Sequence, residues 1–305
     1  MEVDLGRVGI WSRELRYNPD PGARAAAAAE LEDLGYGAVF IPDAGPDAGG
    51  DVLGAVEHLL AATRRMPLAT GVLNIWMNEP ADVAVRRAIL LARFGPRFLL
   101  GLGNSHAPLV ESVLGVPYAR PYTKMTAYLD ALDAAEPPVP AGERMLAALG
   151  PRMLALARAR ARAVHPYLVP PEHTAAARHA LGPGIVLAPE QAVVLGGDRR
   201  VTRERARAFV QDYLALPNYV RNLRRLGFTE DDVRGQASDR LVDALVAHGD
   251  EDAIAARVRA HHDAGADHVC IYVFGSGFGS GSGSGSGEAI PLDAWRRLAP
   301  ALTGR

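Results

Sequence analysis

Short apolar runs alternate with longer stretches of helical periodicity along most of this chain. The runs are nearly continuous in hydrophobic residues, which is typical of strands that are buried on both faces of a parallel sheet. Repeated strand–helix units predict an α/β fold, and eight of them predict a closed (β/α)8 TIM barrel. The predicted strands lie at residues 8–11, 38–41, 68–73, 98–102, 145–149, 164–169, 185–187 (resuming at 192–195) and 268–274.

Helical periodicity fills the stretches between these strands. Val83, Leu90 and Phe94, for example, recur at the spacing of a stripe that faces a core. The longest helical stretch, residues 201–248, predicts a helical insertion between the seventh and eighth strands. No change of composition marks an internal boundary, so residues 1–305 are expected to form one domain.

A glycine and serine repeat at residues 275–287 interrupts the pattern directly after the last predicted strand. Such a composition cannot form a packed core and predicts a flexible loop. The repeat is either a tolerated, even engineered, insertion or a lid beside the barrel mouth. The first interpretation is favoured, because exposed loops accept insertions at little cost.

The charge and the cysteine content indicate which binding partners and which cellular compartment to expect. The formal net charge of -2 gives no electrostatic reason to expect nucleic acid or an anionic membrane surface as a partner. The single Cys270 cannot form an internal disulfide, which suits a reducing cytoplasm. No signal peptide and no apolar run of about 20 residues is visible, so a cytoplasmic protein is expected.

Candidate functional residues follow from the predicted barrel, because catalytic groups in such barrels lie where strands end. His106, after the fourth strand, is a candidate general acid or hydrogen-bond donor, or else a structural helix cap. Gly101 and Gly103 just before it are expected to let a ligand approach the backbone. The strand-end candidates are Trp11, Asp43, Asn74, Trp76, Asn104, Ser105, His106, His165, Tyr167 and Tyr272.

Several known chemistries are not indicated by the sequence. There is no zinc-ligand pattern, no Gly-x-Ser-x-Gly nucleophile elbow and no complete dinucleotide fingerprint. Trp11, Trp76 and Tyr167 could line a flat substrate pocket, although aromatic residues at strand ends are also ordinary packing. His173 and His261 lie on predicted helices and are expected to face solvent.

Three segments together suggest a family. They are Ala-Thr-Gly-Val-Leu-Asn-Ile-Trp at 69–76, Gly-Leu-Gly-Asn-Ser-His at 101–106 and Ala-Leu-Gly-Pro-Arg-Met at 148–153. The chain resembles the luciferase-like flavin and deazaflavin oxidoreductases, particularly their coenzyme F420-dependent actinobacterial branch. The resemblance implies a (β/α)8 barrel with an insertion and F420 as cofactor, with FMN as the alternative. It also implies hydride exchange with a small organic substrate; a homodimer is expected.

The same resemblance assigns roles to individual residues. Gly71-Val72 would match the family's non-proline cis peptide, which supports the cofactor ring from behind. Asn74, Asn104, Ser105 and His106 would line the ring and the substrate. The remaining cofactor-binding candidates are Gly150, Pro151 and Met153, along the cofactor's side chain and phosphate, and His165.

One departure from the family pattern limits the expected chemistry. Many F420-dependent members carry an Asp-His pair after the second strand, but here the pair is Asp43-Ala44. His106 therefore becomes the best acid–base candidate, with Asn104 and Asp43 as further catalytic candidates. The main alternative is an FMN-dependent monooxygenase that uses reduced flavin and oxygen. The missing histidine and the glycine and serine repeat also leave open a flavin- or deazaflavin-binding protein without turnover. The substrate cannot be named from the sequence.

Overall fold

The computed structural model describes residues 3–43, 51–274 and 289–304, so the glycine and serine repeat lies outside the described residues. Its strands form one sheet in which every pair is parallel. The strands are β1 Val8–Trp11, β2 Val39–Ile41, β3 Leu68–Thr70, β4 Leu73–Asn74, β5 Phe98–Gly103, β6 Arg144–Leu146, β7 Ala163–Val164, β8 Val186–Leu187, β9 Glu190–Leu195, β10 Val246–Gly249 and β11 Val269–Val273.

The sheet closes into a barrel through β8 and β9, which only Ala188 and Pro189 separate. β8 pairs with β7, and β9 pairs with β11, which in turn lies beside β1. The backbone continues the closure on both sides, because Glu190 N–H donates to Pro166 O at 2.8 Å and Cys270 N–H donates to Pro189 O at 2.9 Å. Counting β3 with β4 and β8 with β9, and leaving out β10, which pairs with β9 alone, eight strand positions remain, and the predicted (β/α)8 barrel is confirmed.

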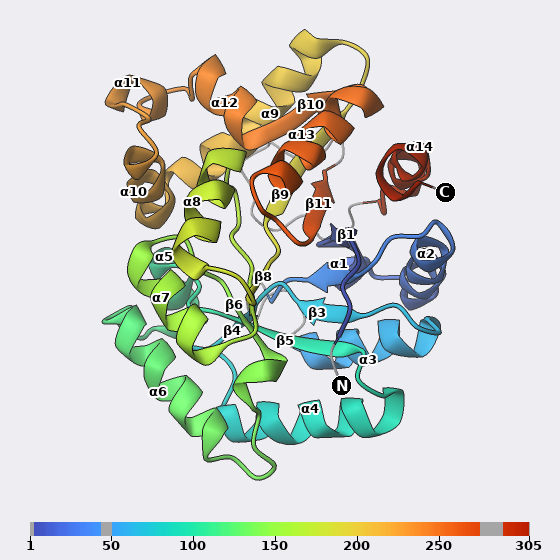
Figure 1. The fold of residues 1–305 in the computed structure, drawn as a ribbon, viewed down its shortest axis with the longest axis vertical. Coiled ribbons are helices and arrows are strands. Elements are labelled where there is room, and N and C mark those ends of the chain that lie inside the picture. Colours follow the sequence, from blue (N-terminus) through green and yellow to red (C-terminus); the bar gives the residue numbers. More distant parts are fainter. Residues whose placement is uncertain (1–2, 44–50, 275–288, 305) are drawn as a thin grey trace.

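Helices surround this sheet, and the insertion gathers at one end of the molecule (Figure 1). No helix among the described residues is long and apolar enough to span a membrane. The helices are α1 Glu14–Tyr17, α2 Pro21–Asp33, α3 Val52–Ala62, α4 Pro80–Phe94, α5 Ala107–Leu114, α6 Pro121–Asp133, α7 Pro151–Arg160, α8 Pro171–Leu181, α9 Arg199–Leu214, α10 Pro217–Arg225, α11 Glu230–Val233, α12 Asp239–Leu245, α13 Glu251–Asp263 and α14 Leu292–Thr303.

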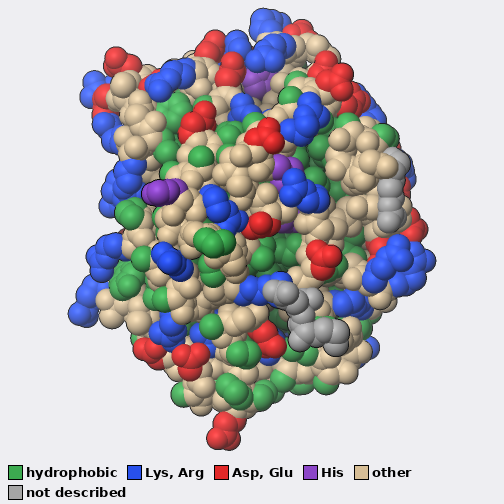
Figure 2. Space-filling model, viewed as in Figure 1, with side chains coloured by type: hydrophobic (Ala, Val, Ile, Leu, Met, Phe, Trp, Pro, Cys, Tyr) green, Lys and Arg blue, Asp and Glu red, His purple; other side chains and the backbone are tan. Residues whose placement is uncertain are grey.

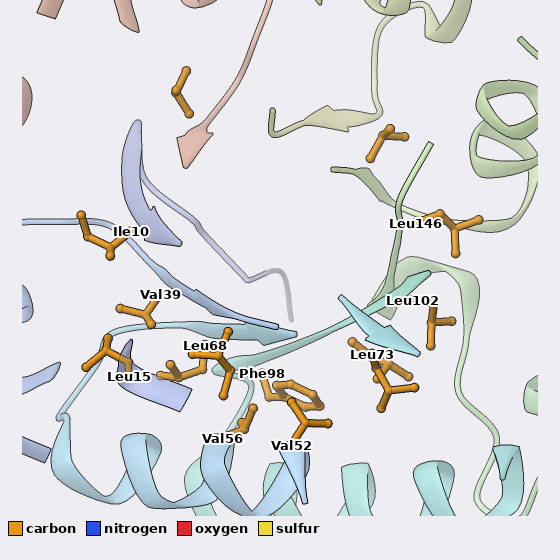
Figure 3. Packing of buried hydrophobic residues seen from close by; sticks show 14 of the residues in the cluster. Ile10, Leu15, Val39, Val52, Val56, Leu68, Leu73, Phe98, Leu102 and Leu146 are labelled. Atoms are coloured by element: carbon orange, nitrogen blue, oxygen red, sulfur yellow. The ribbon is translucent and has the colours of Figure 1, made fainter. Parts of the chain in front are cut away.

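Alternate residues of each strand belong to two separate cores, as the period of two along a strand requires. Val39 and Leu68 pack outward against the helices, whereas their neighbours Phe40 and Ala69 point into the barrel. Figure 3 shows the outer layer, with Val52 and other residues of α3 beneath the strands. The prediction that the strands are buried on both faces is confirmed.

The insertion between the seventh and eighth strands is mostly helical, as predicted, and comprises α9 to α12. Residues 246–248, the end of the predicted helical stretch, instead form the strand β10 together with Gly249. They pair with β9 along the edge that β11 leaves free. Because that edge exists only after the barrel has closed, its pairing overrides the local helical pattern.

The surface carries mixed charge. Figure 2 shows acidic and basic side chains interspersed over the face in view, without a large field of one sign. His173 and His261, which were expected to face solvent, are instead buried, with 3% and 0% of their surface exposed. His261 joins α8 to the sheet, because its ring bonds to Thr174 Oγ1 at 2.8 Å and to Gln191 Oε1 at 3.0 Å. Apolar helix faces alone did not reveal these polar contacts.

Candidate active site

All strands of the barrel are parallel, so their carboxyl ends open at one mouth. At this mouth the indole N–H of Trp11, the last residue of β1, donates to Gly71 O at 2.6 Å. The Trp11 ring also lies 5.3 Å from the ring of Tyr167 and 4.6 Å from that of Tyr272. The structure thus brings together three aromatic side chains from the first, sixth and eighth strand positions and a backbone carbonyl group from the third.

The peptide bond between Gly71 and Val72 is cis, as predicted, and it separates β3 from β4. The expectation that Gly101 and Gly103 make room for a ligand is wrong. A Cβ at Gly101 would meet Thr70 O at 1.9 Å, and one at Gly103 would meet Val72 Cγ2 at 2.3 Å. These two glycines therefore allow β5 to pack closely against the preceding strand segment.

Asp43 organises the loop after β4. Its Oδ2 accepts a hydrogen bond from Asn74 N–H at 3.1 Å and another from the Asn78 side-chain amide at 2.8 Å. Burial raises the pKa of Asp43, while these hydrogen bonds act in the opposite direction. Asp43 thus has a clear positioning function for Asn74; its catalytic role stays a prediction.

Three buried polar atoms at this side of the mouth have no hydrogen-bond partner among the described residues: Asn74 Nδ2, Asn104 Oδ1 and His106 Nδ1. We call Asn74, Asn104 and His106 the polar lobe. Ser105 between the last two has φ 57°, which turns the chain sharply before α5. Because unpaired buried polar groups are costly, their convergence here indicates a ligand site.

His106 lies just after β5 and carries a half-buried imidazole ring, whose acid–base role stays a prediction. Burial lowers its pKa, and the neighbouring Asn218 side chain opposes this shift. His106 is the N-cap residue of α5, but its side chain makes no capping hydrogen bond. The structural interpretation as a helix-capping side chain is therefore wrong, and Nδ1 is left for another partner.

A second group, which we call the aromatic lobe, adjoins the polar lobe through Tyr219. It consists of Trp11, Tyr167, Tyr213, Tyr219 and Tyr272. Tyr167 and Tyr213 share a hydroxyl–hydroxyl hydrogen bond of 2.8 Å. Tyr219, on α10, connects the lobes, since its ring lies 5.5 Å from His106 and 6.4 Å from Tyr167.

Glu190 is a fully buried carboxyl group inside the barrel, near the aromatic lobe. Its Oε2 accepts a hydrogen bond from Leu168 N–H at 3.0 Å, whereas Oε1 has no partner among the described residues. Burial raises the pKa of Glu190 to about 8, with the Leu168 hydrogen bond opposing. Glu190 therefore holds a proton at neutral pH.

His165 also lies in the barrel interior, where its Nδ1 bonds to Ala188 O at 2.6 Å and its ring packs 5.0 Å from that of Phe40. Burial lowers its pKa to about 4, so the ring is neutral. These contacts account for one of the two ring nitrogens; the expected cofactor contact stays a prediction.

The amino end of α7 carries the predicted phosphate-binding residues Gly150, Pro151 and Met153. No side chain caps this helix. A Cβ at Gly150 would lie 3.2 Å from a guanidinium nitrogen of Arg225, so that side chain reaches across from α10. A helix amino end beside a guanidinium group is suited to an anion.

Trp76 is not part of the aromatic lobe. Its ring packs 5.4 Å from that of Tyr118 and 5.4 Å from the Lys124 ammonium nitrogen. Tyr118 OH in turn donates to Ser105 O at 3.3 Å. Trp76 therefore flanks the polar lobe, whereas Trp11 and Tyr167 form the opposite wall; a substrate contact for all three stays a prediction.

Sequence reasoning missed four residues of this region. Tyr213, Tyr219 and Arg225 come from the insertion, and no local pattern indicates where that insertion folds back. Glu190 was visible as a carboxyl group at the start of an apolar run, which is the available signal for a buried titratable group.

The closed parallel barrel and the polar and aromatic groups at its mouth define a TIM-barrel protein with a ligand site at the carboxyl ends of its strands. The sequence profile of the luciferase-like monooxygenase family matches residues 7–268. The chain therefore belongs to this family, as its sequence resemblance predicted.

A curated relative gives a narrower similarity. A Mycobacterium tuberculosis protein provisionally named a coenzyme F420-dependent oxidoreductase is 27% identical over 124 residues, which cover 41% of this chain and 33% of the relative. The match thus spans about a third of that relative's length.

Solved structures share the fold over nearly the whole chain. The F420-dependent tetrahydromethanopterin reductase from Methanopyrus kandleri has a TM-score of 0.71 at 18% identity, covering 99% of this chain and 98% of that one. An F420-dependent secondary alcohol dehydrogenase with an F420–acetone adduct gives 0.68 at 15%, covering 99% of each chain. The FMN-bound oxygenating component of 3,6-diketocamphane monooxygenase from Pseudomonas putida gives 0.70 at 10%, covering 98% and 99%.

Proposed function

We propose that this protein is an F420-dependent oxidoreductase that exchanges a hydride with a small organic substrate. The carrying observation is the polar lobe, where three buried polar atoms without partners among the described residues converge at the carboxyl ends of β4 and β5. The partial similarity to the mycobacterial F420-dependent relative supports F420 as the cofactor.

The residues present suit this cofactor at two places. A planar ring that carries both donors and acceptors would satisfy the Asn74 amide and the Asn104 carbonyl oxygen of the polar lobe. A phosphate group suits the uncapped amino end of α7 beside Arg225. When bound, F420 supplies the hydride-carrying carbon C5 of its ring.

The chain's own residues have three functions in this proposal. His106, neutral and unpaired at Nδ1, holds or accepts the substrate proton. Tyr219 and the rest of the aromatic lobe exclude water from the mouth. Asp43 fixes the Asn74 backbone through its 3.1 Å hydrogen bond and so orients the polar lobe.

A parallel titration of the purified protein with F420 and with FMN tests the cofactor. Trp11 adjoins the site and provides the fluorescence signal. We expect binding of F420 at micromolar concentration and weaker binding of FMN. A double variant, Asn74→Leu and Asn104→Leu, removes the amide groups and should weaken F420 binding. Tighter binding of FMN than of F420 would contradict the proposal.

The second candidate is a monooxygenase that uses reduced FMN and oxygen. The family match and the fold shared with an FMN-bound monooxygenase favour this candidate. Oxygen uptake with FMN, NADH and a flavin reductase separates it from the F420-dependent oxidoreductase. Cofactor binding without turnover of any substrate in a broad screen would instead support a flavin- or deazaflavin-binding protein that has no catalytic activity.

A further inference from the structure

We infer that Arg13 and the aromatic lobe form the substrate subsite, and that this subsite takes an organic substrate carrying a carboxylate group. The inference deepens the proposed function and rests on it, because it assigns the substrate class to the same barrel mouth. It arises from a cation and two hydroxyl groups that the cofactor-binding residues do not use.

Arg13 follows the last residue of β1 by two positions and is partly buried at the mouth. Its guanidinium carbon lies 5.8 Å from the centre of the Tyr17 ring. Trp11, two positions earlier, packs against Tyr167 and Tyr272, so Arg13 leaves β1 beside the aromatic lobe.

Arg13 has no carboxylate partner among the residues that the structure describes. Other shielded arginines bond to groups of the protein: Arg87 pairs with Glu143, whereas Arg97 and Arg257 donate to backbone carbonyl oxygens. Removing a guanidinium group from water without a counter-ion is unfavourable. The Arg13 guanidinium group, without such a partner among the described residues, is open to an anionic ligand.

The neighbouring hydroxyl groups favour a carboxylate as that anion. Tyr167 and Tyr213 are both partly exposed, and their 2.8 Å hydrogen bond uses only one of their two hydroxyl protons. Burial raises the pKa of Tyr213 to about 12, so its hydroxyl keeps its proton. A guanidinium fork and one spare O–H match the lone pairs of a carboxylate group.

The aromatic rings next to Arg13 indicate what kind of group the carboxylate is attached to. The rings of Trp11 and Tyr272 lie 4.6 Å apart and present apolar surface next to the Arg13 charge. An apolar or aromatic body attached to the carboxylate would pack there. A neutral alcohol or ketone of the same shape would leave the guanidinium group without its counter-ion.

An F420 molecule carries anionic groups of its own, so the test separates the two sources of the anion. Benzoate and its neutral analogue benzamide are titrated into the F420-loaded protein, and F420 is titrated separately. The variants are Arg13→Gln and Arg13→Lys. Lys124→Gln, which removes the cation beside Trp76 on the other side of the mouth, is the matched control.

We expect wild type to bind benzoate about tenfold more tightly than benzamide, as one charge-assisted contact allows. Arg13→Gln should abolish this preference, Arg13→Lys should keep part of it, and Lys124→Gln should keep all of it. F420 affinity should change less than about twofold in each variant. Thermal unfolding confirms that each variant is folded.

Two results would overturn the inference while leaving F420 chemistry intact. One is equal binding of benzoate and benzamide by wild type. The other is an Arg13→Gln variant that loses F420 as strongly as benzoate, which would assign the anion to the cofactor. In contrast, a wild type that prefers benzoate but does not bind F420, titrated in the absence of cofactor, would overturn the proposed function and support the anion subsite.

Discussion

The two lobes of the barrel mouth differ in whether their polar atoms find hydrogen-bond partners within the protein. In the polar lobe, Asn74, Asn104 and His106 each leave a buried polar atom without a partner among the described residues. In the aromatic lobe, Tyr167 and Tyr213 pair their hydroxyl groups with each other at 2.8 Å. The polar lobe therefore needs a ligand to complete its hydrogen bonds. The aromatic lobe pairs these two hydroxyl groups internally and lies beside one cation, Arg13, that has no carboxylate partner among the described residues.

This difference suits the polar lobe to the cofactor and the aromatic lobe to the substrate. Unpaired amide and imidazole atoms suit a ligand with many hydrogen-bonding positions, such as a cofactor ring. Packed rings beside one charge suit a smaller molecule with an apolar body and a single anionic group. Tyr219 joins the two lobes, because its ring contacts both His106 and Tyr167.

The largest expected effect comes from the polar lobe. His106→Gln removes the neutral imidazole that we assign to proton transfer, and a group of this kind typically contributes about 10²–10⁴-fold to the rate. Turnover with F420 should fall by this order, while F420 affinity, measured by fluorescence, should change little. If the variant turned over as fast as wild type, His106 would line the site without taking part in proton transfer.

The next effect concerns Glu190, whose folded-state pKa of about 8 lies above its ordinary value of 4.5. The folded protein therefore holds a proton that the unfolded chain releases, and stability falls as pH rises from about 4.5 to 8. Between about pH 6.5 and pH 8 we expect the stabilising contribution of Glu190 to fall by on the order of 2 kcal/mol.

Urea unfolding at both pH values measures this loss. The buried histidines, whose pKa values are lowered, act in the opposite direction, because the unfolded chain loses their protons over the same range. They act equally in every variant, so Glu190→Gln should gain on the order of 2 kcal/mol relative to wild type between the two pH values, whereas Asp231→Asn, at an exposed carboxylate, should follow wild type. Parallel curves for wild type and Glu190→Gln would show that Glu190 is already ionised at pH 6.5.

A smaller effect is expected at the amino end of α7. Arg225→Gln removes the guanidinium group next to Gly150 and should weaken F420 binding about tenfold, because one charge-assisted contact is lost. Arg224→Gln on the same helix removes a cation that pairs with Glu230 instead, and F420 affinity should remain unchanged. If both variants behave alike, the phosphate lies elsewhere.

The smallest effect tests the connection between the lobes. Tyr219→Ala removes the ring that covers His106 and should raise the pKa of His106 towards its ordinary value, because burial is what lowers it. The imidazole C2 proton signal, assigned by comparison with His106→Gln, follows this titration in an NMR experiment. An unchanged pKa would show that other groups bury the ring.

The sequence by itself determined the barrel and one side of its mouth. The β strands follow from short, nearly continuous apolar runs, and Asn74, Asn104 and His106 follow from their places at or directly after the ends of those runs. Such features are local, so a linear pattern reveals them. The family resemblance added the cis bond at Gly71-Val72, which periodicity alone could not show.

Only the tertiary structure decided the other side of the mouth. Tyr213 and Tyr219 reach Tyr167 across more than forty intervening residues, and Arg225 reaches Gly150 from the same insertion. β10 forms because barrel closure leaves a free edge on β9. These contacts depend on where an insertion packs after the barrel has closed, and that placement is set by long-range burial rather than by local sequence periodicity.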